Sequence, residues 1–401
     1  MRICPLLVSI TAISACFAAE IPLDGAHAIN VSLPDLLQSA GDIATGLVDA
    51  FGNQLTPSYF FNFVGNLVLG FPIQFASLII STICAAVLTE DGINPDPADV
   101  PSTDDISIQF RTACDIKTYR LKDLATIVDD PDFDASKRVV IAASGWLTNA
   151  NKSDDVLEGL GKAYRCRGDT NFLGIDVGRY IETLYTWSSL NTKNIGEQVA
   201  NALVDLTKVV PLENFHLMGH SLGAQIVGET ARKFKRLTGK QIPRVTGFDP
   251  AGPCFNYGQK LITLSTGDAD YVDIIHTDPG IAAQPRATGD SDFFVGGRFP
   301  IQNGCLEPVC SHQRSWQYYV ESVYPGNEYN FPSKRCDSLL HLEQGRCVGK
   351  DYPMGYAVPK NLKGLFVLKV NPSEPYGTNS SSSYTSPSSE CGSCESIGFS
   401  N

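Results

Sequence analysis

A serine placed between two glycines, at the junction of a strand-like and a helix-like segment, constrains this chain most. Residues 215–218 read as a short strand, residues 222–237 read as a helix, and the sequence around Ser221 is GHSLG. A sharp turn from strand to helix strains the serine backbone, so bulk is excluded two positions before and after it. The turn also exposes the hydroxyl and aims the helix N-terminus at it. The pattern therefore indicates a nucleophilic serine rather than an ordinary loop.

The sequence around this turn alternates between strand-like and helix-like blocks, which is typical of an α/β fold. Residues 138–143 (RVVIAA) are a continuous apolar run, as expected for a buried parallel strand. Helical spacing extends over residues 192–210. Further strands are expected at 171–176, 244–248 and 271–275. Together these blocks predict an α/β fold with a mostly parallel central sheet.

The two ends of the chain differ in composition from this central part. Residues 1–18 have the basic start, apolar core and small final residues of a secretory signal peptide. Residues 19–89 form an acidic and apolar segment that we expect to be mainly helical, and residues 90–110 are an Asp/Pro-rich linker. Residues 373–401 are Ser-rich and are expected to be disordered. The α/β domain is therefore expected over residues 111–372.

The N-terminal segment also carries most of the net charge of −12. Residues 19–113 contain eleven acidic side chains and one arginine, whereas residues 51–89 contain no charged side chain at all. The apolar run over residues 73–88 is shorter than the roughly 20 residues that span a bilayer, so a buried or lipid-facing helix is favoured over a membrane span. Without a basic excess to neutralise phosphates, binding to nucleic acid is not expected.

Cysteine usage supports export from the cell. Twelve cysteines are present, and removal of residues 1–18 leaves ten, an even number suited to disulfides in a secreted protein. Glycosylation sequons occur at Asn30, Asn151 and Asn379. We therefore expect a secreted, extracellular protein.

A nucleophilic serine needs a base and an acid, and the chain has only six histidines. Position along the chain argues against four of them, namely His27, His216, His220 and His341. His312 is favoured because the base of this kind of fold follows the last strands, with His276, at the end of a strand, as the alternative.

The acid is expected to end the strand that follows the nucleophile. Asp249, directly before Pro250, occupies that position, with a purely structural turn aspartate as the alternative. No cluster of His, Asp and Cys side chains indicates a metal, so neither a metal nor a cofactor is expected.

Four motifs in this order, GHSLGA, GFDPAGP, DIIHTDPG and CSHQRS, resemble the pancreatic lipase family from about Cys114 to Tyr376. The resemblance implies an α/β-hydrolase fold with Ser221 as nucleophile, Asp249 as acid and His312 as base.

The resemblance also implies an oxyanion hole. Its backbone N–H donors would be those of Leu222 and Trp146, although Ser144 stands where the family has a histidine.

Two pairs of cysteines refine this resemblance. Cys305 and Cys310 stand where the family closes its lid with a disulfide, but only four residues lie between them, and Cys336 and Cys347 match a second family disulfide. A loop this short resembles phospholipases of the A1 type and insect-like neutral lipases, which implies that no colipase is needed. The chain also leaves no room for the family's C-terminal β-sandwich.

These observations predict a secreted lipid carboxylic-ester hydrolase, either a phospholipase of the A1 type or an acylglycerol lipase. Its partner would be a lipid substrate at a membrane or droplet surface. The alternative is a catalytically weak or inactive lipid-binding protein, similar to a yolk storage protein, on the same fold.

Overall fold

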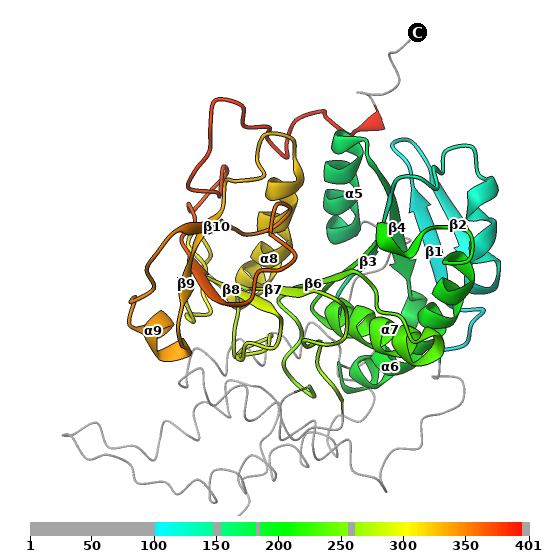
Figure 1. Cartoon of the computed structure of the whole chain (residues 1–401), viewed down its shortest axis with the longest axis horizontal. Helices are drawn as coiled ribbons and strands as arrows, with labels where there is room; N and C mark the ends of the chain where they lie inside the picture. Colours follow the sequence, from blue (N-terminus) through cyan, green and yellow to red (C-terminus); the bar gives the residue numbers. More distant parts are fainter. Residues whose placement is uncertain (1–100, 147–153, 182–184, 256–260, 395–401) are drawn as a thin grey trace, which may run out of the picture. The chain divides into compact units, whose positions relative to one another are not determined.

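The computed structural model describes residues 101–146, 154–181, 185–255 and 261–394 (Figure 1). The strands are β1 Ser107–Arg111, β2 Ile116–Arg120, β3 Arg138–Ala143, β4 Thr170–Asp176, β5 Phe215–His220, β6 Arg244–Phe248, β7 Val272–His276, β8 Ser291–Val295, β9 Pro332–Cys336, β10 Asp351–Pro353 and β11 Gly364–Leu368. The α-helices are α5 Asp155–Arg167, α6 Tyr185–Leu206, α7 Leu222–Thr238, α8 Pro308–Val323 and α9 Leu339–Glu343. Short 3₁₀-helices are η3 Leu121–Asp129, η4 Gly178–Ile181 and η5 Leu212–Asn214.

The strands form one eleven-stranded sheet in the order β10-β9-β11-β8-β7-β6-β5-β3-β4-β1-β2. Neighbouring strands are parallel from β4 to β11, whereas β1 and β2 at one end and β9 and β10 at the other are antiparallel. Helices cover both faces of such a sheet, so its central strands are buried, as in β3, where every residue after Arg138 is buried. The expected α/β fold with a mostly parallel sheet is confirmed.

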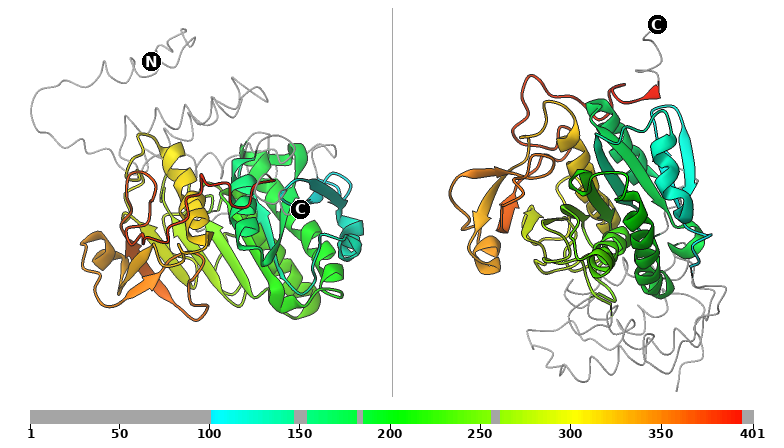
Figure 2. Two further views of the ribbon diagram at one scale, coloured as in Figure 1. Left: turned by 90° about the horizontal axis from the view of Figure 1, so that it is seen from above. Right: turned by 45° about the vertical axis from the view of Figure 1, so that its right-hand side comes forward.

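Two helical layers cover the sheet, with α6 and α7 on one face and α5 and α8 on the other (Figures 1 and 2). Side chains alternate between these layers along each strand. In β5, Leu217 joins the apolar core under α6 and α7, whereas Met218 joins the core that contains Leu160 of α5 and Tyr319 of α8. This alternation decides which side chains of β5 lie on the α8 side of the sheet.

Most of the expected elements lie where the sequence places them. The strands at 138–143 and 244–248 are confirmed residue for residue as β3 and β6. The expected helix at 192–210 is part of α6, which begins earlier, at Tyr185, and ends at Leu206. The predicted end of the linker at residue 110 is wrong, because β1 begins at Ser107 and pairs with β4.

The expectation of a disordered tail is wrong for residues 373–394. Two disulfides, Cys166–Cys391 and Cys114–Cys394, fasten this segment to α5 and to the loop after β1. The buried Glu321 of α8 also accepts hydrogen bonds from the backbone N–H groups of residues 376 and 377. A serine-rich composition shows none of these long-range links, which hold the tail across α8 and α5 (Figure 1).

The signal peptide, the acidic and apolar segment and residues 90–100 of the linker lie outside the described residues. Among the residues that are described, no helix combines the length and the apolar character needed to cross a membrane.

Candidate active site

Ser221 lies in the tight turn between β5 and α7, with backbone angles φ 55° and ψ −120°. Such a left-handed conformation is strained for a residue with a side chain. The turn is close enough that a Cβ on Gly219 would lie 2.3 Å from the backbone of Gly223, and a Cβ on Gly223 would lie 2.2 Å from the carbonyl oxygen of Ala143. Both glycines are therefore required by contact with neighbouring backbone, as the GHSLG pattern predicts.

Asp249 and His312 lie together next to this turn. Asp249 directly follows β6, and its Oδ2 is 2.6 Å from Nδ1 of His312, which belongs to the first turns of α8. The other oxygen of Asp249 accepts hydrogen bonds from the backbone N–H groups of Thr277 at 2.8 Å and Asp278 at 3.1 Å. These donors stabilise an ionised carboxylate, which holds the proton of the neutral imidazole on Nδ1. Nε2 of His312 is then left free to act as a base.

Ser221 and His312 both lie in the part of the chain that the structure describes. The Ser221 hydroxyl makes no direct hydrogen bond to the His312 imidazole there. Bonds between a nucleophile and its base are frequently long before substrate binds and tighten in the reacting complex. The arrangement therefore brings Asp249 and His312 together directly and places Ser221 beside them, in the turn after the neighbouring strand β5.

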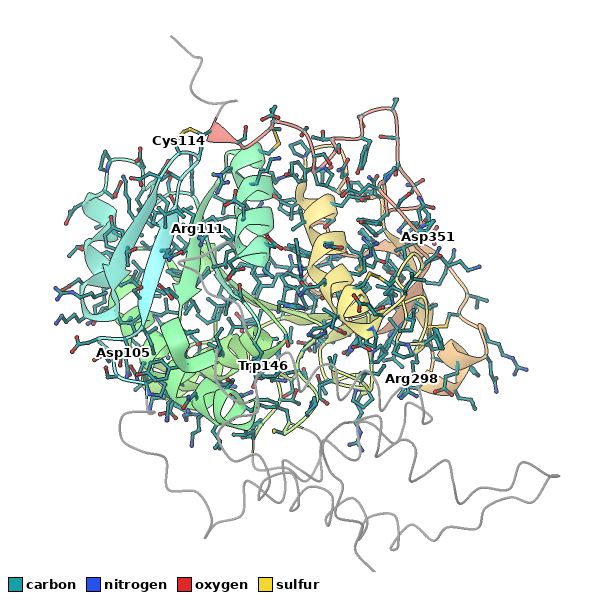
Figure 3. All side chains as sticks on the ribbon, turned by 180° about the vertical axis from the view of Figure 1, so that it is seen from behind. Asp105, Arg111, Cys114, Trp146, Arg298 and Asp351 are labelled. Atoms are coloured by element: carbon teal, nitrogen blue, oxygen red, sulfur yellow. A yellow bond between two sulfur atoms is a disulfide. The ribbon has the colours of Figure 1, made fainter. Side chains whose placement is uncertain are left out.

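The loop after β3 packs against Ser221. A Cβ on Gly145 would lie only 2.8 Å from Cβ of Ser221, so the backbone of residues 145 and 146 passes directly beside the nucleophile. Trp146 itself is buried, and Figure 3 shows it at the same edge of the sheet as Arg298, which follows β8. Leu222 begins α7 on the other side of the serine. The loop after β3 and the start of α7 thus lie on two sides of Ser221.

Ser144, which replaces the family histidine, is buried in this loop. It lies near Asp154, whose carboxylate accepts hydrogen bonds from the backbone N–H groups of Val156 and Leu157 and so caps α5. Burial raises the pKa of Asp154, and the nearby Ser144 hydroxyl opposes that change. The loop after β3 is therefore close to a helix cap that sequence reasoning did not identify.

A second acid, Asp278, is buried beside Asp249. Burial, followed by the negative charge of Asp249, raises the pKa of Asp278 well above its ordinary value. Its Oδ1 has no hydrogen-bond partner, and Oδ2 accepts only from the backbone N–H of Ala282 at 3.2 Å. Asp249 accepts more hydrogen bonds than Asp278, so a negative charge is better stabilised on Asp249.

Asp249, Asp278 and His312 are also the residues whose spacing fits a metal, since one donor atom from each lies within 4.8 Å of the others. The Nδ1 atom of His312 and Oδ2 of Asp249 are already bonded to each other, however, and Asp249 Oδ1 takes two backbone donors. These contacts fit an acid–base pair, and the absence of a metal stays a prediction.

The remaining histidines of the fold lie elsewhere or act differently. Nε2 of His276, the alternative base, is 2.8 Å from Asp292 and its ring stacks on Phe294, so it belongs to a separate buried pair. His216 bonds the hydroxyl of Thr246 at 2.7 Å. The ring of His220 lies against that of His312, with centroids 4.5 Å apart. The sequence did not predict this contact.

Both candidate disulfides are present in the structure. The bond between Cys305 and Cys310 closes the short loop at the start of α8, where Leu306 is fully exposed, and Cys336–Cys347 links β9 to the chain after α9. Of the glycosylation candidates, Asn379 is exposed, whereas Asn30 and Asn151 lie outside the described residues.

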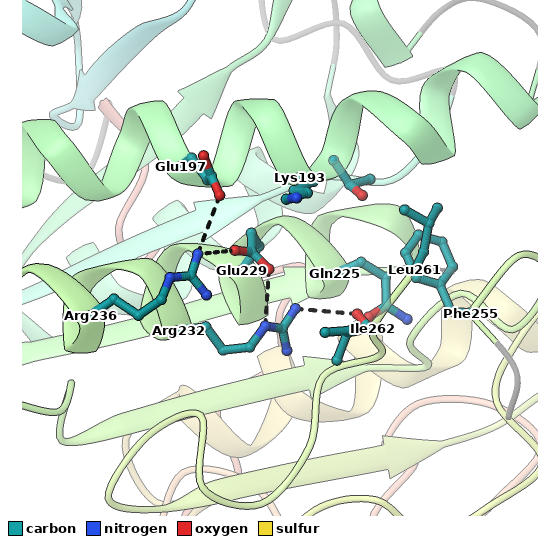
Figure 4. Close-up of a pocket in the computed structure, with 10 residues that line it drawn as sticks. Lys193, Glu197, Gln225, Glu229, Arg232, Arg236, Phe255, Leu261 and Ile262 are labelled. Carbon is teal, nitrogen blue, oxygen red and sulfur yellow. Dashed lines mark hydrogen bonds and ion pairs between the residues drawn. The ribbon is translucent and has the colours of Figure 1, made fainter. Parts of the chain in front are cut away.

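A hollow of about 290 Å³ lies on the opposite, α6 and α7, side of the sheet (Figure 4). Its charged wall is internally paired, since Arg232 bonds Glu229 and Arg236 bonds both Glu229 and Glu197. Neither Asp249 nor His312 lines it, so it is separate from the candidate site.

Several known proteins are similar to this chain. A family model described as Lipase matches residues 98–376. Vitellogenin-3 of Drosophila melanogaster is 35% identical over 51% of this chain and 49% of its own length. Lipoprotein lipase of Rattus norvegicus is 34% identical over 63% of this chain and 59% of its own length.

The chain therefore spans about half to three fifths of the length of these curated relatives. Among solved structures, a carboxylesterase of Bacillus cereus is 17% identical with a TM-score of 0.25, over 40% of this chain and 79% of that one.

Proposed function

The chain belongs to the lipase family, and from that membership we propose that it is a secreted carboxylic-ester hydrolase that acts on lipids through a Ser-His-Asp triad. The observation that carries the proposal is the 2.6 Å bond between Asp249 and Nδ1 of His312, next to the strained turn that presents Ser221. Asp249, His312 and Ser221 belong to three separate parts of the chain and lie at one edge of the sheet, which supports the proposal.

The proposed reaction is acyl transfer in two stages. Nε2 of His312 takes the proton of the Ser221 hydroxyl as the serine oxygen attacks the ester carbonyl, and Asp249 stabilises the imidazolium that forms. The N–H groups of Leu222 and Trp146 bind the oxyanion, and removal of one such donor costs about 10²–10³ in kcat in comparable sites. His312 then returns the proton to the leaving alcohol, and water releases the fatty acid from the serine by the reverse steps.

Lipid is the proposed substrate class because of the family and the short loop between Cys305 and Cys310. A four-residue loop leaves little to cover the site, which favours a phospholipase of the A1 type or an acylglycerol lipase that works at a lipid surface without colipase. We also propose that residues 1–18 are removed on export and that the mature chain is extracellular, which fits its disulfides.

The proposal is tested by acid-release assays on the purified full chain with phospholipid vesicles, a triacylglycerol emulsion and a soluble short-chain ester. We expect one of the two lipids to be hydrolysed, and Ser221→Ala to lower kcat by about 10⁶. Ser333→Ala is the matched control, because this buried serine bonds the carbonyl of Tyr352 away from the site. Cleavage of the soluble ester alone would contradict the lipid assignment, and hydrolysis that persists in Ser221→Ala would contradict the nucleophile.

The second candidate is a lipid-binding storage protein, favoured by the similarity to vitellogenins and by Ser144 in the oxyanion loop. It differs from the first candidate in one measurable respect, namely that the wild-type chain would bind lipid vesicles without releasing fatty acid. Release that Ser221→Ala abolishes would exclude this candidate.

A further inference from the structure

His220 occupies a position that links three parts of the candidate site. It is the last residue of β5 and precedes Ser221, and its side chain is buried with 2% exposure. Alternation along β5 places it on the same face as Met218, toward α8. Its Nε2 lies 3.2 Å from the main-chain carbonyl oxygen of His312.

The contact with His312 fixes the tautomer of His220. A carbonyl oxygen only accepts, so Nε2 of His220 carries the proton and donates it, and Nδ1 is left as an acceptor. The hydroxyl of Ser315 donates to the same carbonyl at 2.8 Å. Two side chains from different elements thus hold the backbone of the residue whose imidazole must act as base.

The other nitrogen of His220 faces the loop after β3. A Cβ on Gly145 would lie 3.2 Å from Nδ1 of His220 and 2.8 Å from Cβ of Ser221, so the loop that carries Trp146 rests against both. Nδ1 is buried and makes no hydrogen bond. An unpaired buried acceptor is unfavourable, and here it lies beside the backbone that forms the oxyanion hole.

His220 also stays out of the proton transfer. Burial, and then the neighbouring His312, lower its pKa well below the ordinary value. When His312 takes the serine proton, His220 therefore remains neutral and does not compete for it.

We propose that His220 is a positioning residue that fixes the backbone of His312 through Nε2 and supports the oxyanion loop at Gly145 through its buried ring. The inference rests on the proposed function, since it assigns a role within that site. It explains why a histidine directly before the proposed nucleophile is buried against the proposed base.

The test compares His220→Phe, which removes both nitrogens, with His220→Gln, whose amide keeps a donor. His216→Gln is the matched control, because His216 lies on the same strand and the same face but bonds Thr246. The reaction of each folded full-length variant with an alkyl phosphonate ester is followed over a range of concentrations, which separates the maximal rate from the half-saturating concentration.

We expect the maximal rate to fall about tenfold in His220→Phe, as the loss of one buried hydrogen bond can cause. The half-saturating concentration should be unchanged, His220→Gln should recover most of the rate, and His216→Gln should match the wild type. Equal rates in all four proteins, or equally slow Phe and Gln variants, would overturn the proposal. A wild type that does not react would instead contradict the proposed function.

A second measurement tests the role of His220 whether or not the wild type reacts with the phosphonate. The proton on Nδ1 of His312, bonded to Asp249, is observed by NMR in the wild type and each variant. If His220 fixes His312, this signal broadens by faster exchange in His220→Phe but not in His216→Gln. An unchanged signal in His220→Phe would overturn the proposal whether or not the chain is a hydrolase.

Discussion

Two buried aspartates on neighbouring strands have different kinds of partner. Asp273, near the start of β7, forms a two-point ion pair with Arg244 at the start of β6, with N–O distances of 2.9 and 2.7 Å. Asp249, just past the end of β6, bonds His312 at 2.6 Å. Both carboxylates are fully buried. The two aspartates therefore have the same degree of burial, but they bind different partners and lie at opposite edges of the sheet.

The partners of the two aspartates, an arginine and a histidine, differ in whether they can release a proton near neutral pH. Burial lowers the pKa of Arg244, but the charge of Asp273 raises it by more, so Arg244 stays charged in this pair. An imidazole gains and loses its proton near neutral pH. The pair at the amino ends of the strands is therefore structural, whereas the pair at the carboxyl ends, beside Ser221, is able to move a proton.

Of the changes that test this comparison, the largest effect is expected from replacing the carboxylate at the carboxyl edge. Asp249→Asn keeps the shape of the side chain but removes the charge that orients and stabilises His312. We expect kcat to fall about 10⁴-fold, as for the same change in a serine-protease triad. Thermal unfolding by circular dichroism checks that the variant is folded, and a loss of less than tenfold would remove Asp249 from the mechanism.

The same change at the amino edge should act on stability. Asp273→Asn leaves Arg244 as a buried charge without its partner, which is expected to lower the free energy of unfolding by about 3–5 kcal/mol. Activity per folded molecule should stay within twofold of the wild type. Denaturant unfolding measures the first quantity and ester hydrolysis the second. A stable variant with a large loss of kcat would contradict the division between the two edges.

Gly145→Ala tests the packing of the loop after β3. The added Cβ would lie 2.8 Å from Cβ of Ser221, so the loop must shift and carry the Trp146 N–H away. We expect a loss of about 10²–10³ in kcat, comparable to removal of one oxyanion donor. Gly168→Ala, which strains a left-handed residue after α5 with no atom within 4 Å, is the control and should reduce stability alone.

The smallest effect is expected from Asp278→Asn. Because the pKa of Asp278 is raised in the folded chain, its contribution to stability is complete below about pH 4, where the unfolded aspartate is also protonated, and declines as pH rises. The asparagine variant lacks this decline. Its melting temperature should match that of the wild type near pH 3.5 and exceed it increasingly toward neutral pH. A gap that narrows as pH rises would show that Asp278 is ionised when folded.

The candidate triad could be predicted from the sequence because its signals are local. The two glycines around Ser221 reflect backbone contacts within one turn, and Asp249 and His312 follow from their order along the chain. His220 could not be placed in this way, because its contact with His312 joins residues 92 positions apart. The raised pKa of Asp278 likewise depends on its burial beside Asp249 in the folded chain.

The ends of the domain were the least predictable part of the fold. Cysteine counts do not give connectivity, so the serine-rich tail lacked any sign of its disulfides from Cys391 and Cys394. The strand β1 was hidden in the Asp/Pro-rich stretch because it is identified by its pairing with β2 and β4, which lie outside that stretch.

The central claim, that Ser221 is a nucleophile activated by His312, is tested most directly by mapping a covalent adduct. Purified chain is treated with an alkyl phosphonate ester, digested and analysed by mass spectrometry. The account predicts one adduct per molecule, on the peptide that contains Ser221, and a strong loss of labelling in His312→Ala. An unlabelled Ser221 in folded protein, or equal labelling without His312, would contradict it.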